Sequence, residues 1–290
     1  MKFRLISKYG EGLPLLQIIS DEGFKVDVWL KEGKTDLPKA QAWNTSLAQD
    51  TIILFDYCGS GKIADTLMKS GFAVYGAGTL NDTIEYGAFG TQMAKLAGMR
   101  IPEEKRFNTY NEALEDGWQL QPQRPGENFF TVREHIEGPE ISIEKYYSRG
   151  MPVPKTLNSK LETGDAAAVR IWKKNTPKLY NRTLRKVEPF LMRFRYSGPL
   201  SCKVIIGDDI YFVKWLTRFN PKGMAAFKEA LNKKLGQFIV DMFKGSQVIK
   251  PKYDWYCSNG TAKCPDKETQ AYILNDVMDV MKKLQKWRYL

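Results

Sequence analysis

The sequence predicts a mixed protein of the α/β (α+β) class, with a parallel sheet near the N-terminus and antiparallel strands further along. Runs of strand and helix type alternate over residues 1–98, which is typical of a parallel sheet with crossover helices. Downstream, Leu200–Ile206 and Ile210–Leu216 are joined by Gly-Asp-Asp, which predicts a tight hairpin. The 290 residues are 43% hydrophobic and 27% charged, so the chain can bury a sizeable core.

Over the first hundred residues, short apolar runs indicate strands and longer amphipathic runs indicate helices. In chain order, the expected elements are strand Phe3–Ser7, helix Leu13–Glu22, strands Lys25–Leu30 and Thr51–Asp56, helix Lys62–Ser70, strand Ala73–Tyr75 and helix Leu80–Gly98. The last helix should end on Gly98, because glycine favours the C-terminal cap.

Beyond residue 98, further strands and a strongly basic helix are expected. In order, the elements are helix Asn108–Glu115, strands Trp118–Gln123, Phe129–His135 and Ile141–Tyr147, a loop over 152–170, helix Thr176–Tyr196, the hairpin, helix Gly223–Lys244, turns around Tyr253–Cys264 and helix Lys267–Trp287. Asn108 or Thr109 is the expected N-cap of the first of these helices. We therefore divide the chain into residues 1–98, residues 99–222 and a helical segment, 223–290.

Composition narrows the class of protein. No apolar run approaches the roughly 18–20 residues that span a bilayer, and the first residues resemble a strand more than a signal peptide. We therefore expect a cytoplasmic protein without a membrane partner. The four cysteines, Cys58, Cys202, Cys257 and Cys264, are too few for a disulfide scaffold, and His135 is the one histidine. A metal site of the Cys/His type is not expected.

The formal net charge of +11 favours an anionic partner: a nucleotide, a nucleic acid or a phosphorylated metabolite. Positive charge concentrates on the predicted helix Thr176–Tyr196, whose basic residues include Arg182, Arg185, Lys186, Arg193 and Arg195. This helix suits contact with nucleic acid, although a solvated helix face has the same pattern.

Two glycine-containing loops each follow a strand and open a helix, namely Ser7–Gly12 and Cys58–Lys62. Small residues at such a position let a phosphate or a carboxylate approach backbone N–H groups. The candidate substrate-loop residues are Gly10, Gly12, Gly59, Ser60 and Gly61. Neither loop has the full pattern of a P-loop or of a dinucleotide fingerprint.

Two stretches of the sequence are distinctive. One is Val132–Ser142, VREHIEGPEIS, and the other is the hairpin, with Tyr-x-Gly-Pro-Leu before it and Arg-Phe-Asn after it. Together they resemble phosphoribosylamine-glycine ligases of the ATP-grasp superfamily. The similarity extends over most of residues 1–220. It implies an N-terminal pre-ATP-grasp domain followed by an ATP-grasp domain, here shortened. In that family ATP lies between two sheets and activates a carboxylate as an acyl phosphate, which an amine then attacks.

Carried over residue by residue, the resemblance implies the following nucleotide-binding residues: Gln121, Arg133, Glu134, His135, Ile136, Glu140 and Lys203. The main chain at 134–136 would face the adenine, and Glu140 would accept hydrogen bonds from the ribose hydroxyls. Arg218 would lie near the phosphates as a fixed positive charge, and in a degenerate member of the family Lys214 would take the place of the metal's charge. Gly164 and Asp165 match the family's substrate loop, and ATP is the implied cofactor.

The chain departs from the family's pattern at several catalytic positions. Gln121 stands where the family has a phosphate-binding lysine, and Pro122–Gly126 leaves little room for its glycine-rich flap. Gly164–Val169 lacks the polar groups of the substrate loop. Lys214 and Leu216 match the metal-holding glutamate and asparagine, and because magnesium needs oxygen ligands, magnesium is doubtful.

Three hypotheses remain open. In the first, the chain is a degenerate ATP-grasp protein that binds a nucleotide, a nucleic acid or an active partner subunit. The second is a divergent ATP-dependent carboxylate-amine ligase, with Asp165, Asp208 or Asp209 holding magnesium and Lys155, Lys203 or Arg218 holding phosphates. The third is a nucleic-acid binder that shares only the architecture, for which steep salt dependence of binding is the signature.

Overall fold

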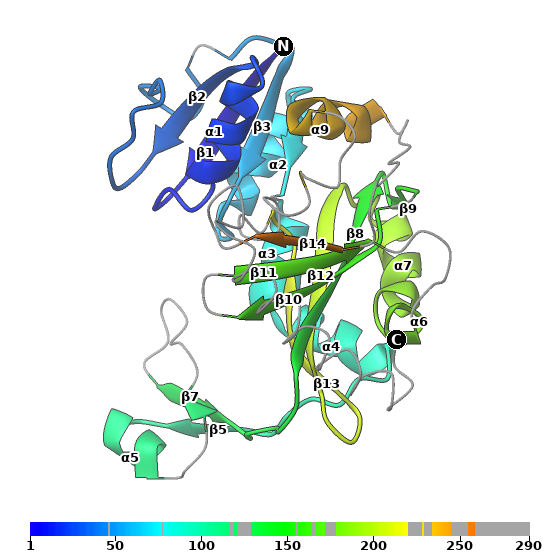
Figure 1. Cartoon of the computed structure of the whole chain (residues 1–290). Helices are drawn as coiled ribbons and strands as arrows, with labels where there is room; N and C mark the ends of the chain where they lie inside the picture. Colours follow the sequence, from blue (N-terminus) through cyan, green and yellow to red (C-terminus); the bar gives the residue numbers. More distant parts are fainter. Residues whose placement is uncertain are drawn as a thin grey trace.

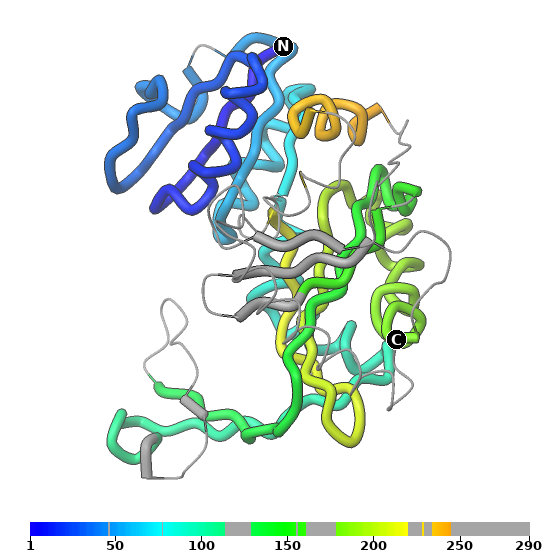
Figure 2. Tube along the Cα trace, viewed as in Figure 1, coloured from blue at the N-terminus to red at the C-terminus, as the bar shows by residue number. Residues whose placement is uncertain are grey.

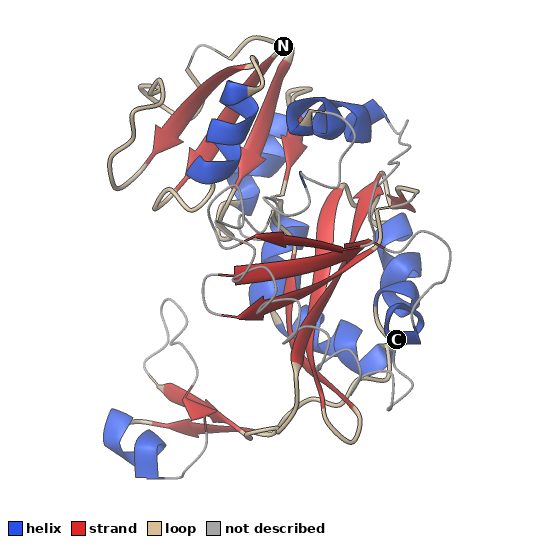
Figure 3. Cartoon of the chain, viewed as in Figure 1, coloured by secondary structure: helices blue, strands red, loops and turns tan. Residues whose placement is uncertain are grey.

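The structure is a computed structural model of the chain. It describes residues 1–45, 47–76, 78–115, 119–120, 129–154, 156–163, 166–171, 178–219, 228, 234–244 and 255–258. Three β-sheets form the frame of these residues, and helices cover the faces of the two larger sheets (Figure 3). The chain drawn as a tube in Figure 2 shows how the N-terminal sheet lies against the larger, central one.

The N-terminal sheet is parallel, with the order β2-β1-β3-β4. Its strands are β1 (Lys2–Ser7), β2 (Lys25–Leu30), β3 (Thr51–Phe55) and β4 (Ala73–Tyr75), and its helices are α1 (Leu13–Asp21) and α2 (Gly61–Lys69). The central strands are buried on both faces, as the apolar runs of β1 and β3 indicate. The predicted parallel sheet is therefore confirmed, and each of its elements lies within one or two residues of the expected bounds.

The central sheet is antiparallel and has the order β13-β12-β8-β10-β11-β14, with β9 paired to β8. Its strands are β8 (Glu140–Ser148), β9 (Met151–Pro152), β10 (Asn158–Thr163), β11 (Ala166–Ile171), β12 (Gly198–Ile206), β13 (Ile210–Leu216) and β14 (Trp255–Ser258). The predicted hairpin is its β12–β13 edge. The expectation of a loop over 152–170 is wrong, because β10 and β11 form a second hairpin there.

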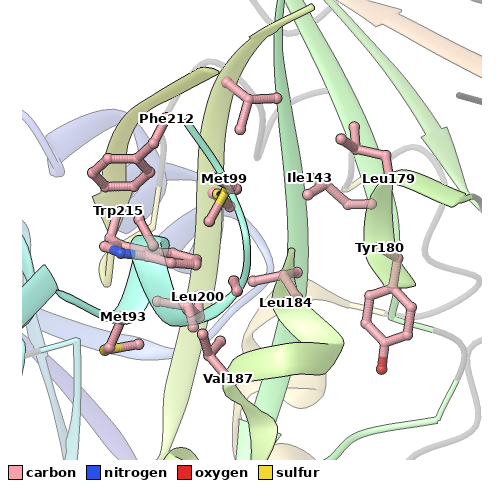
Figure 4. Close-up of a cluster of buried hydrophobic side chains, with 14 of the residues drawn as sticks. Met93, Met99, Ile143, Leu179, Tyr180, Leu184, Val187, Leu200, Phe212 and Trp215 are labelled. Carbon is pink, nitrogen blue, oxygen red and sulfur yellow. Dashed lines mark hydrogen bonds between the residues drawn. The ribbon is translucent and has the colours of Figure 1, made fainter. Parts of the chain in front are cut away.

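One face of the central sheet is apolar. Alternate residues of β12, among them Leu200, Cys202 and Val204, are fully buried there together with Ile143 and Trp215. Figure 4 shows this core with the helices that cover it. These helices are α3 (Thr79–Tyr86), α4 (Ala88–Leu96), α6 (Lys178–Arg182) and α7 (Leu184–Arg193).

Two helices predicted as continuous are broken in the structure. The expected Leu80–Gly98 helix divides at Gly87, whose backbone is extended, and Trp215 Nε1 donates a hydrogen bond of 2.8 Å to Gly90 O just beyond the corner. A Cβ at Gly90 would lie 2.0 Å from a backbone oxygen, so only glycine fits there. The expected Thr176–Tyr196 helix divides at Thr183 into α6 and α7.

A small antiparallel sheet projects from the rest of the molecule (Figure 1). It consists of β5 (Glu104–Phe107), β6 (Gln119–Leu120) and β7 (Phe130–Arg133), with helix α5 (Tyr110–Glu115) beside it. Thr109 caps α5, because Glu112 N donates to Thr109 Oγ1 at 3.3 Å and Thr109 N donates to Glu112 Oε2 at 3.4 Å. The sequence did not predict β5, which lies in a charged stretch.

The described part of residues 223–290 contains α9 (Leu235–Lys244) and the strand β14. In α9, Phe238, Ile239 and Met242 are buried in the core that α1 and the N-terminal sheet share (Figure 1). The segment predicted as helical therefore also supplies an edge strand to the central sheet. The expected helix Lys267–Trp287 lies outside the described residues. No helix that the structure describes combines the length and the apolarity needed to cross a membrane.

A buried ion pair lies on the face of the central sheet opposite its apolar core. Lys160 Nζ lies 2.8 Å from Glu144 Oε2, and both side chains are 1% exposed. Asn158 Nδ2 also reaches Glu144, at 3.4 Å from Oε1. Because a buried charge without its partner is strongly unfavourable, each member of the pair depends on the other.

The Lys160→Met variant tests this dependence. It should lower the free energy of unfolding by about 3–5 kcal/mol, because the Glu144 carboxylate stays buried without its partner. In a urea titration, the double variant Lys160→Met/Glu144→Gln should recover a large part of that loss. Equal midpoints for the wild-type protein and Lys160→Met would contradict the argument.

Candidate functional site

A cavity of about 350 Å³ lies between the small sheet, the central sheet and the corner between α3 and α4. Its size falls within the range of roughly 300–1,000 Å³ that is usual for small-molecule sites. The lining residues come from all three sides: Ile84, Glu85, Tyr86, Gly87, Gly90, Thr91, Ile101, Glu104, Thr131, Arg133, Glu134, Glu140, Lys203, Ile205, Phe212, Val213, Lys214 and Trp215.

A β-bulge in β13 decides which side chain faces this cavity. Lys203 pairs with Lys214, but the next residue of β12, Val204, pairs with Phe212, which leaves Val213 as an extra residue. Because side chains alternate along a strand, Phe212 and Lys214 would share one face if β13 ran through Val213 without a bulge. The bulge therefore turns Lys214 toward the cavity.

Arg133, at the end of β7, joins the small sheet to the central sheet. Its Nε donates to Glu104 Oε1 at 3.1 Å, and its Nη1 donates to the carbonyl oxygen of Val213, the bulged residue, also at 3.1 Å. The next residue, Glu134, donates its N–H to Glu103 O at 3.0 Å. These contacts hold β7 and the following main chain along one wall of the cavity.

Two lysines and a carboxylate form the charged wall of the cavity. Lys203 makes an ion pair with Glu140 across β12 and β8. Lys214 makes no ion pair with any residue that the structure describes, and its side chain is open to the cavity. The surrounding protein lowers the pKa of Lys214 because it partly removes the ammonium group from water, and the neighbouring cations Lys203 and Arg218 lower this pKa further.

Arg218 lies beyond the end of β13, where the hairpin meets the N-terminal sheet. Its Nη1 donates to Asp56 O at 2.6 Å and lies 3.1 Å from Glu11 Oε2, while its Nε lies 3.6 Å from Glu85 Oε2. Glu85 also accepts the N–H of Thr217 at 2.6 Å. Arg218 therefore connects the central sheet to the loops of the N-terminal sheet, and it does not line the cavity.

The N–H groups of the glycine loops are already bonded within the chain. Gly12 N donates to Asp56 Oδ2 at 2.6 Å, and Gly10 N donates to Ser7 Oγ at 2.7 Å. In the second loop, Gly59 N and Gly61 N donate to the two oxygens of Asp82 at 2.6 and 2.8 Å. The hydroxyl of Ser60 donates to Tyr57 OH at 2.6 Å. The role of these loops in binding a substrate stays a prediction, and these four N–H groups are engaged in the structure.

Asp56 is the buried centre of the first loop. Its carboxylate accepts hydrogen bonds from Ser7 Oγ and Gly12 N, both at 2.6 Å. Burial raises the pKa of Asp56 above its ordinary value of 3.8, because removal from water disfavours the charged form more than these hydrogen bonds favour it. Nearby, burial also raises the pKa of the Cys58 thiol.

The structure brings together five of the sequence-predicted nucleotide and phosphate residues around the cavity: Arg133, Glu134, Glu140, Lys203 and Lys214. His135 and Ile136 do not line it, and His135 is exposed. Gln121, Gly164, Asp165 and Lys155 lie outside the described residues. The sequence did not single out Glu85, Glu104 or Thr131, because none of them belongs to a recognisable pattern.

Asp208 and Asp209, considered above as magnesium ligands, lie at the turn of the β12–β13 hairpin and do not line the cavity. Arg100 Nη1 lies 2.9 Å from Asp208 Oδ2, and Arg182 Nη2 lies 2.6 Å from Asp209 Oδ1. Both carboxylates are therefore ion-paired. Within the described ranges, no three His, Cys, Asp or Glu side chains gather closely enough to hold a metal ion.

The chain thus combines a parallel N-terminal sheet with a charged cavity between a small projecting sheet and a central antiparallel sheet, an arrangement of the ATP-grasp type. Comparison with solved structures shows that this chain has that fold and resembles enzymes of the phosphoribosylamine-glycine ligase type. No protein-family model matches the sequence, and no curated protein matches it.

Three solved structures illustrate the similarity. Phosphoribosylamine–glycine ligase from Thermotoga maritima has a TM-score of 0.55 at 12% identity, over 89% of this chain and 79% of that one. A putative ATP-grasp superfamily protein from Archaeoglobus fulgidus also has 0.55, at 10% identity, with 89% and 98% covered. D-alanine–D-alanine ligase from Bacillus anthracis, complexed with ATP, has 0.50 at 14% identity, with 84% and 96% covered. At these identities the comparisons establish the fold.

The raised pKa of Asp56 predicts how stability depends on pH. Because the folded protein holds the Asp56 proton more tightly than the unfolded chain does, the contribution of Asp56 to stability falls as the pH rises above 3.8. The contribution levels off above the raised pKa. Urea titrations at several pH values give the free energies of unfolding of the wild type and of Asp56→Asn. The wild-type value minus the variant value should therefore decrease over this window. An increase over the same window would contradict the argument.

Proposed function

We propose that the protein binds a purine nucleoside triphosphate, with ATP as the first candidate, in the cavity between the small and central sheets, and that it does not carry out the ligase reaction. The observation that carries the proposal is the position of Lys203 and Lys214 on one wall of the cavity. Ammonium groups there suit the phosphates of a nucleotide.

The other walls suit the remainder of a nucleotide. Ile101 and Ile205 contribute apolar surface, on which a base can pack. The main chain around Glu134 is held beside them by its hydrogen bond to Glu103 O. Two further points support the proposal: in the family that this chain resembles, the adenine lies along the matching stretch, and D-alanine–D-alanine ligase, of similar fold, has been solved with ATP.

The same residues argue against ligation. Phosphoryl transfer requires metal ions and cations that neutralise the charge developing on the phosphoryl oxygens. In this chain a lysine and a leucine, Lys214 and Leu216, occupy the positions that match the family's metal ligands. Arg218, which matches the family's phosphate-side cation, is already bonded to Asp56 O and lies near Glu11 and Glu85.

An active carboxylate-amine ligase is the second candidate, and the fold itself favours it, because both sheets that enclose ATP in such enzymes are present. Incubation of the protein with ATP, magnesium and mixtures of amino acids distinguishes the two. No ADP above the background of protein-free samples is expected from a binding protein. ADP release that depends on both an amine and a carboxylate would overturn the binding-only proposal.

A cavity-filling variant tests the location of the nucleotide. Ile205 lies on β12 and lines the cavity, so Ile205→Trp should occupy the space of the ligand and weaken ATP binding by about tenfold or more. Ile205→Val is the matched control, since it leaves the space open, and should bind ATP as the wild type does. Isothermal calorimetry with magnesium present gives the affinities. Wild-type affinity in Ile205→Trp would place the nucleotide elsewhere.

A further inference from the structure

Magnesium is the metal that the fold implies, and the residues at this cavity do not fit it. We infer that the nucleotide binds here without a divalent cation, and that the ammonium group of Lys214 supplies positive charge in its place. The inference rests on the proposed function, since it concerns the same cavity and the same ligand. Four observations support it: strand register, the bulge at Val213, the state of the nearby carboxylates and the surroundings of Lys214.

The strand register places two like charges side by side. Lys203 and Lys214 are directly opposite each other on β12 and β13. Like charges at opposite positions of an antiparallel pair are destabilising. Glu140 compensates Lys203 through an ion pair, whereas Lys214 makes no ion pair with any residue that the structure describes. A bound anion that contacts both ammonium groups would relieve this repulsion.

The bulge makes the position of Lys214 specific. An unbroken β13 would direct Lys214 into the core beside Phe212, where an unpaired ammonium group would be strongly unfavourable. With the extra residue, the lysine instead faces the cavity, and the Val213 carbonyl accepts a hydrogen bond from Arg133. The bulge at Val213 therefore orients the Lys214 ammonium group and also holds Arg133, which lines another wall of the cavity.

The carboxylates around the cavity are engaged and do not form a metal site. Glu85 accepts from Thr217 N at 2.6 Å and Thr217 Oγ1 at 2.8 Å, and Glu140 is paired with Lys203. Glu104 is paired with Arg133, and Glu134 accepts from Glu103 N at 3.2 Å. Magnesium requires an octahedral set of oxygen ligands at short distance. Across the part of the chain that the structure describes, no such cluster of acidic side chains is found.

The surroundings of Lys214 favour a phosphate ligand. The neighbouring protein partly removes the Lys214 ammonium group from water. This disfavours its charged form and therefore lowers its pKa. A phosphate in the cavity would restore a partner to the ammonium group and would raise that pKa again. A charge-assisted hydrogen bond of this kind is short and strong.

The experiment compares ATP affinity in excess EDTA and in excess magnesium, by isothermal calorimetry, for the wild type and two variants. Wild-type affinity should be equal within about twofold in the two conditions. Lys214→Met removes the charge, so ATP should bind about tenfold more weakly or worse in both conditions. Lys214→Glu supplies a carboxylate at the same position, so its affinity should be low in EDTA and should recover with magnesium. Lys34→Glu, on an exposed loop, changes the net charge equally and should behave as the wild type.

The outcomes separate this inference from the proposed function. If the wild type binds ATP only with magnesium, the metal-free inference is overturned and the nucleotide site stands. If ATP does not bind in either condition, the proposed function fails as well. Equal affinity of Lys214→Met and the wild type would show that Lys214 does not contact the phosphates. Near-ultraviolet circular dichroism of each variant establishes that a loss of affinity does not reflect unfolding.

Discussion

The alternation of side chains along β8 and β12 determines both the core and the cavity. In β12, Leu200, Cys202, Val204 and Ile206 are fully buried on one face, so the intervening Lys203 must face the other. A shift of one residue would bury charge and expose the apolar side chains, so the register is strongly specified. Packing of the apolar face therefore also determines the position of the intervening side chains, such as Lys203, which line the cavity and contribute nothing to the core.

Where local sequence and tertiary packing agree, the fold could be predicted from the sequence. The N-terminal strands are continuous apolar runs because they are buried on both faces, and the β12–β13 hairpin carries a strong turn signal. The strands β10 and β11 could not be recognised in this way, because Asn158–Thr163 is polar and Ala166–Ile171 begins with three alanines. Their structure comes from pairing with neighbouring strands, which a local pattern does not contain.

The cavity residues that the sequence singled out all belong to a recognisable stretch, either Arg133–Glu140 or the hairpin with Lys203 and Lys214. The stretch from Arg133 to Glu140 lies on one segment, and the structure places both its ends at the cavity. Glu85 and Glu104 come from other elements and were missed, because only the tertiary fold brings them there. In the glycine loops, the pattern does not show that Asp56 and Asp82, from distant positions in the sequence, accept hydrogen bonds from Gly12, Gly59 and Gly61.

The two faces of the central sheet are under different physical constraints. On the apolar face, a change of one methylene disturbs a close-packed core. On the cavity face, Lys214 is open to solvent, and exchanging a carboxylate for an ammonium group there alters the ligand that can bind and leaves the core packing unchanged. Architecture and chemistry are therefore separable in this protein. The fold places a cavity between two sheets, while the charges on one face determine which ligands that cavity can bind.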